Sequence, residues 1–116
     1  MSPLAAERQD VRRTFVKRVR TQISVAGFTR QEVEAGLRDL LDEFGQRPWL
    51  LDASAYWDDH RKRLVMLIER EGDSLAVQGG DTGATLDEVW DCVIACLDFE
   101  SEIHFDVDSS VFVQTA

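Results

Sequence analysis

Four polar residues near the C-terminal end of this 116-residue chain have types and spacing that could perform chemistry. They occupy alternate positions: Glu102, His104, Asp106 and Asp108. On a β-strand such residues share one face, about 7 Å apart, and carboxylates beside an imidazole can bind a divalent cation. Glu102, His104 and Asp106 could therefore serve a metal-dependent enzyme or sensor. The same alternation is typical of the exposed face of an antiparallel strand, and we predict that this face binds a partner and no metal.

Two further groups match metal-binding or catalytic patterns only in part. Cys92 and Cys96 lie four positions apart on a predicted helix, which offers at most two zinc ligands and disfavours a disulfide. We expect two free thiols, as in a reducing cytoplasm. Asp58, Asp59 and His60 precede three basic residues, a composition typical of an exposed turn rather than of a positioned acid–base pair.

The sequence shows no pattern for a serine or cysteine nucleophile, a phosphate-binding loop or a metalloprotease helix. No apolar run approaches the length of a membrane span, and we expect no signal peptide. These features predict a cytoplasmic protein without enzymatic activity and without a cofactor.

The first element that must support these residues is ambiguous. Residues 4–25 place apolar side chains at helical spacing, with basic residues opposite. Their many β-branched residues would also suit a strand. We favour a helix.

Two later helices have clearer signals. Thr29 and Glu32 form a capping box that begins a helix over 30–44, and Gly45 should end it in a left-handed conformation. A further helix is expected over 86–98. The residues of the first of these helices that should be buried are Val33, Leu37, Leu40, Leu41 and Phe44.

Alternating hydrophobicity predicts the strands, with a turn or bulge at 108–110. They are expected at residues 49–57, 64–70, 74–78, 103–107 and 111–114. The order ααβββαββ favours an α+β fold, in which helices pack on one face of an antiparallel sheet of four to five strands. We expect a single domain, 1–116, with a basic helical segment at 1–27 and an α+β body at 28–116.

Charge is unevenly distributed along the chain, whose net charge is −9. The first 30 residues hold seven Lys and Arg against two Asp and Glu, whereas no Lys or Arg follows Arg70. The basic segment comprises Arg12, Arg13, Lys17, Arg18 and Arg20. These side chains could contact phosphates, but the net charge opposes it, so we expect neither nucleic acid nor a membrane as partner.

Asp87, Asp91 and Asp98 share one face of the helix predicted over 86–98. Like charges one turn apart repel, so a cation must neutralise them. We expect the basic N-terminal segment to cover this helix stripe. The acidic strand face around Asp106 and Asp108 should stay free for another molecule.

The favoured function is a non-enzymatic module that neutralises or regulates a partner protein with a basic surface, as immunity proteins and inhibitors do. Tyr56, Trp57 and Trp49 could anchor it. The predicted contact residues include Tyr56, Trp57, Asp87, Asp91, Glu102, His104, Asp106 and Asp108. One alternative is a homodimeric escort or assembly chaperone, and another is the metal-dependent enzyme or sensor described above.

Overall fold

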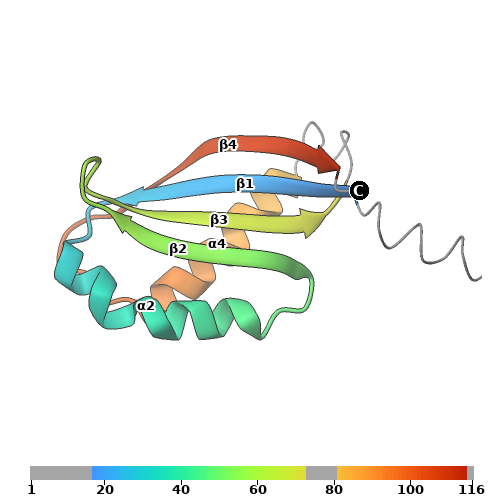
Figure 1. The fold of residues 1–116 in the computed structure, drawn as a ribbon. Coiled ribbons are helices and arrows are strands. Elements are labelled where there is room, and N and C mark those ends of the chain that lie inside the picture. The colour runs from blue at the N-terminus through green and yellow to red at the C-terminus, as the bar shows by residue number, and fades with distance from the viewer. Residues whose placement is uncertain (1–16, 73–80, 115–116) are drawn as a thin grey trace, which may run out of the picture.

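The computed structural model describes residues 17–72 and 81–114. The described elements follow one another in the order β-α-β-β-α-β (Figure 1). The elements are β1 (Lys17–Ala26), α2 (Arg30–Gly45), β2 (Leu50–Asp58), β3 (Arg63–Glu71), α4 (Asp81–Cys96) and β4 (His104–Gln114). This is the ferredoxin-like, or split βαβ, arrangement.

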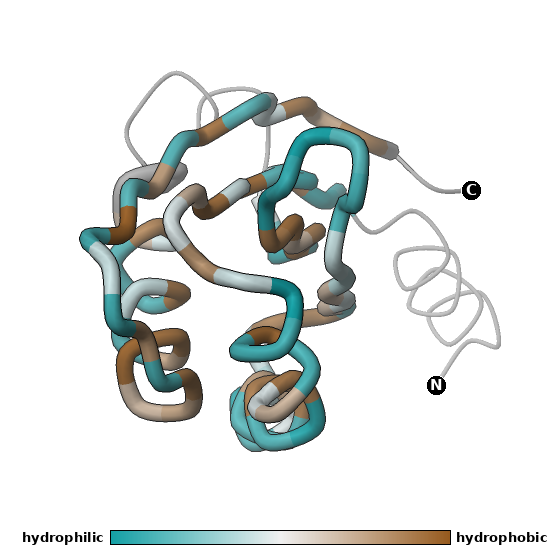
Figure 2. The backbone as a smooth tube through the Cα atoms, turned by 90° about the vertical axis from the view of Figure 1, so that its left-hand side faces the viewer, coloured by the Kyte–Doolittle hydropathy of each residue, from teal (hydrophilic) through white to brown (hydrophobic). Residues whose placement is uncertain are grey.

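All neighbouring strands are antiparallel, in the order β2-β3-β1-β4. Both helices cover the same face of the sheet, and Figure 2 shows them from the hairpin end as a separate layer beside the strands. The predicted α+β class, an antiparallel sheet with helices on one face, is confirmed. The opposite face of the sheet carries no helix among the described residues.

The prediction of a helix over residues 4–25 is wrong for residues 17–25, because Lys17–Ala26 forms β1 in the centre of the sheet. Val19, Ile23 and Val25 are buried on one face of this strand. Pairing with strands on both sides satisfies its backbone, and the pleat suits its β-branched residues. The order is therefore βαββαβ rather than ααβββαββ. Residues 4–16 and the strand expected at 74–78 lie outside the described residues.

The two last predicted strands form one continuous strand, β4, with an irregular register. Ile23 of β1 pairs with Val107, whereas the preceding Gln22 pairs with Ser109. Asp108 is therefore an extra residue on β4, as expected at a β-bulge. The prediction of a turn or bulge at 108–110 is confirmed as a bulge.

The core lies between the sheet and the two helices. From α2, Val33, Leu40 and Phe44 are buried, and α4 crosses close to Gly36. A Cβ on Gly36 would overlap the Leu97 side chain and lie 2.6 Å from the carbonyl oxygen of Cys96. Glycine at this position therefore lets the two helices approach each other.

The capping box at the start of α2 is present, with reciprocal hydrogen bonds between Thr29 and Glu32. The predicted left-handed end at Gly45 is wrong. Gln46 caps the helix in a right-handed conformation, and Gly27 is the glycine with positive φ in the described ranges. Neither of the two described helices is long and apolar enough to cross a membrane.

Candidate functional site

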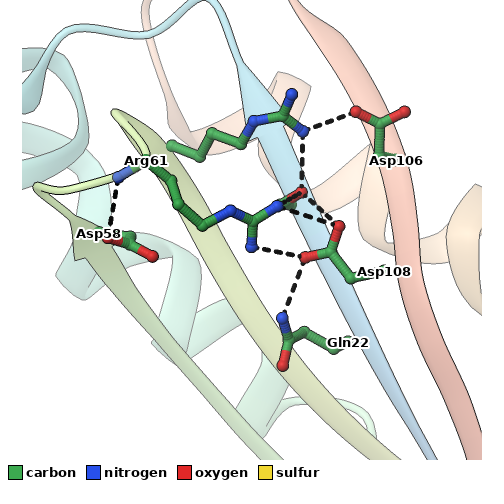
Figure 3. Close-up of polar contacts among 7 residues, drawn as sticks. Gln22, Asp58, Arg61, Asp106 and Asp108 are labelled. Carbon is green, nitrogen blue, oxygen red and sulfur yellow. Dashed lines mark hydrogen bonds and ion pairs between the residues drawn. The ribbon is translucent and has the colours of Figure 1, made fainter.

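Arginines from the β2–β3 hairpin lie over the helix-free face of the sheet and reach the carboxylates of β4 (Figure 3). Arg63 Nη1 lies 2.6 Å from Asp106 Oδ2, and Arg61 Nη1 lies 2.9 Å from Asp108 Oδ2. Both guanidinium groups also donate to the hydroxyl of the buried Ser24 on β1. Asp106 and Asp108 were expected to stay free for another molecule, but both carboxylates are already paired with arginines of this chain. A partner of these two carboxylates would compete with Arg61 and Arg63.

The bulge places the Asp108 carboxylate among several donors. Gln22 Nε2 donates at 3.0 Å, Ser24 Oγ at 2.9 Å, and Arg61 donates through two nitrogens. The Asp108 side chain is 18% exposed. The bonds from Arg61 are the largest influence and lower the pKa of Asp108 from 3.8 to about 2, although partial burial opposes them.

Replacing Asp108 with asparagine is expected to lower the free energy of unfolding by about 1 kcal/mol at neutral pH, since solvent screens part of the interaction. A folded-state pKa below the ordinary value stabilises the fold above pH 3.8 and stops doing so as the pH falls towards 2. Urea unfolding at a series of pH values should therefore show the two proteins converging over that range.

The matched control is Asp106→Asn, because the Asp106 side chain is 56% exposed. Asp106→Asn should lower the free energy of unfolding by less than Asp108→Asn does. A larger loss for Asp106→Asn, or a difference for Asp108→Asn that stays constant down to pH 2, would contradict the assigned role of Asp108.

The hairpin tip is a structured turn that directs Arg61 back over the sheet. The Asp58 carboxylate accepts from the backbone N–H groups of His60 and Arg61, at 3.0 and 3.1 Å. Lys62 adopts a left-handed conformation, with φ of 57°, and its ammonium lies 3.2 Å from Asp59. These contacts support the prediction of an exposed turn at Asp58, Asp59 and His60.

At the other end of the same face, Glu69 binds two residues of the predicted basic segment. Its side chain, 9% exposed, accepts from Arg20 at 2.8 Å and lies 3.4 Å from Arg18. Lys17 is exposed at the start of β1. Arg12 and Arg13 lie outside the described residues. The described part of the basic segment therefore lies in the sheet and does not cover α4.

The predicted helix stripe is exposed, although α4 ends at Cys96 and Asp98 follows it. Within residues 17–72 and 81–114, none of Asp87, Asp91 and Asp98 forms an ion pair. The neighbouring Glu88 differs, because it binds Arg47 and Arg70.

A groove of about 390 Å³ lies between α2 and the end of α4. The residues that line it include Glu32, Asp39, Asp98 and Cys96. Glu32 is already engaged by the backbone N–H groups of Thr29 and Glu100. The groove therefore presents Asp39 and Asp98 to a cationic side chain.

The charges of the described elements divide by layer. The two helices carry nine Asp and Glu against two Arg, whereas the four strands carry six against five Lys and Arg. In the described part of the chain, Lys17 and Arg38 are the two basic residues outside an ion pair. The excess negative charge therefore lies on the helical side of the molecule.

The three aromatic residues predicted as anchors do not form one cluster. Trp57 packs partly buried against the core, and its indole donates to Asp59 at 3.3 Å. The adjacent Tyr56 is 46% exposed on the opposite face of β2. Trp49 is 51% exposed, and its indole donates to Glu88.

The residues considered for metal binding are not gathered into a site. Among the described residues, no group of three or more His, Cys, Asp or Glu side chains could hold a metal ion. Glu102 and His104 are exposed, and Asp106 is bound by Arg63. Cys92 and Cys96 are free thiols, and burial raises the pKa of both.

Comparison with known protein families finds no match, and neither does comparison with curated proteins. A conserved protein from Methanosarcina mazei Go1 is similar in structure, with 21% identity, a TM-score of 0.39, and coverage of 84% of this chain and 96% of that one. A protein from Bordetella bronchiseptica, described as a candidate antibiotic biosynthesis monooxygenase, shows 14% identity, a TM-score of 0.40, and coverage of 79% and 95%. At this distance neither likeness assigns a function to the chain.

Proposed function

We propose that this chain is a non-enzymatic protein-binding module that engages a basic partner protein through its helical side, in the manner of an immunity protein or inhibitor. We define the acidic helical surface as the exposed carboxylates of α2 and α4, together with that of Asp98 just after α4, that form no ion pair in the described part of the chain. They are Asp39, Asp42, Asp87, Asp91 and Asp98.

The division of charge between the two layers is the observation that carries this proposal. In the sheet, Arg61, Arg63 and Glu69 take part in local ion pairs that neutralise the strand charges. The two helices carry nine acidic residues and two basic residues. A concentrated field of one sign speeds association with an oppositely charged partner and disfavours acidic competitors.

Apolar side chains beside the acidic helical surface could supply the binding energy that charge alone does not. Trp49 and Trp90 are 51% and 44% exposed, and Leu41 is 37% exposed on α2. Large aromatic side chains are the commonest anchors of protein interfaces. The groove beside Asp39 and Asp98 has room for an arginine or lysine of the partner.

A capture experiment with a matched pair of variants tests the proposal. The immobilised chain is expected to retain a partner from a lysate of the source organism at low salt and to release it at high salt. The double variant Asp87→Lys/Asp91→Lys should weaken retention at least tenfold.

The control is Asp52→Lys/Glu71→Lys, which changes the net charge equally but on exposed strand positions. It should retain the partner. Equal losses of retention in both variants would mean that net charge alone controls binding. Undiminished binding by the helix variant would mean that the acidic helical surface is not the binding site.

We also propose a cytoplasmic setting, which the free thiols of Cys92 and Cys96 support.

A further inference from the structure

We propose that residues 109–114 of β4 pair antiparallel with the same residues of a second copy of this chain, extending the sheet across a two-fold axis. This interface lies on the edge of the sheet and borders the acidic helical surface at Trp90. It would make the binding module a homodimer and does not depend on the proposed function.

Among the described strands, β4 lies at the edge of the sheet and pairs with β1 on one side. An edge strand presents unpaired backbone groups to other chains, and proteins usually protect such edges with charges or bulges. The first half of β4 is protected in this way, because Asp106 and Asp108 are bound by arginines and the bulge interrupts the register.

The second half of β4 lacks this protection. Residues 109–114 read Ser-Ser-Val-Phe-Val-Gln, without a charge, a proline or a glycine. Val111 is 46% exposed and Phe112, on the other face of the strand, is 39% exposed. β-Branched and aromatic residues favour pairing, so Val111, Phe112 and Val113 make this the part of β4 best suited to accept a second strand.

Exposed apolar surface continues from β4 onto the neighbouring helix. On α4, Trp90 and Ile94 are 44% and 41% exposed, and Val107 on β4 is 39% exposed. The Trp90 ring lies 4.5 Å from the ring of Phe105, between centroids. A strand added beside β4 would bring its own helix towards this surface and cover it.

The charges along the edge favour a second copy. If the two strands pair about Val111, Ser109 faces Val113 of the other copy and Ser110 faces Phe112. Asp108 then lies opposite residue 114, so carboxylates do not face carboxylates. On β1, Arg20 and Arg18 pair with Val111 and Val113, and Glu69 neutralises part of their positive charge, which limits repulsion between the two copies.

Pairing of β4 with the other edge strand, β2, is disfavoured. β2 carries Asp52 and Asp58, which would add to the carboxylates of β4. Such head-to-tail contacts would also build an open series of copies rather than a closed dimer.

Sedimentation velocity over a range of micromolar concentrations tests the proposal on the full chain. The wild type is expected to form a dimer in reversible equilibrium with a monomer. Val111→Lys should shift the dissociation constant at least tenfold towards monomer, because a lysine on each copy meets its counterpart at the two-fold axis. The matched control Leu51→Lys, at a position 40% exposed on β2, should dimerise as the wild type does.

Backbone hydrogen exchange provides the second measurement. Amides in 109–114 should exchange more slowly as concentration rises, and this dependence should vanish in Val111→Lys. If circular dichroism shows that Val111→Lys is unfolded, Ser109→Lys at an exposed position replaces it. A wild type that stays monomeric, a dimer that survives both β4 variants, or an open series of oligomers that Leu51→Lys stops would each overturn the proposal.

Discussion

Replacing Gly27 with alanine is expected to lower the free energy of unfolding by about 3 kcal/mol or more. Gly27 joins β1 to α2 with a φ of 110°, a conformation that L side chains rarely adopt. The added Cβ would overlap the carbonyl oxygen of Glu102 and lie 2.9 Å from Ile103 Cα. Both are main-chain atoms of the segment that leads into β4, so they cannot rotate away. Urea unfolding followed by circular dichroism measures the loss.

Gly45→Ala is the matched control. A Cβ at Gly45 would meet no atom within 4 Å, and this glycine is the last residue of α2. Alanine there is expected to be neutral or to raise the free energy of unfolding by up to about 1 kcal/mol, since it favours the helix. If Gly27→Ala were as stable as the wild type, the close approach of the β1–α2 connection to Glu102 would be wrong.

Local signals in the sequence predicted most of the fold. The capping box at Thr29 and Glu32 marked the start of α2 to the residue. Strands were expected at 49–57 and 64–70, and β2 and β3 lie within one residue of these bounds. Residues 64–70 are apolar on both faces, which is typical of a central strand, and β3 lies between β2 and β1.

The error in the first element has a physical cause. In β1 the buried residues recur every second position, but Val19 and Ile23 are also four apart, so they fit a helical stripe equally well. Pairing with β3 and β4, which follow much later in the chain, decides between the two readings. Such tertiary contacts override local propensity, and periodicity alone does not contain them.

The acidic strand face shows a similar limit. Alternation predicted that Asp106 projects to one side of its strand, but the sequence did not indicate that Arg63 lies beside it. Arg63 and Asp106 are both next to Ser24, because β1 separates β3 from β4. The arginines at positions 61 and 63, in and next to the predicted turn, were the signal in the sequence that could have indicated a cationic partner for the acidic strand face. The basic segment was expected to cover the helix stripe, but Asp87, Asp91 and Asp98 are exposed, because the described part of that segment pairs in the sheet instead.

Leu40→Ala is expected to lower the free energy of unfolding by about 3 kcal/mol, within the range for large-to-small core changes. Leu40 is 0% exposed and lies in the core with Val33 and Phe44. Removing its side chain leaves a cavity between α2 and the sheet that rigid strands cannot fill. The midpoint of urea unfolding should fall while the slope of the transition stays unchanged.

The adjacent Leu41→Ala serves as control because it makes the same substitution in the same helix. Helical periodicity predicted that both leucines are buried, but Leu41 is 37% exposed. Leu41→Ala should lower the free energy of unfolding by less than about 1 kcal/mol. Equal losses would mean that α2 is rotated so that both leucines enter the core. That rotation would also change which carboxylates of α2 face solvent, so this pair of variants tests the orientation on which the acidic helical surface depends.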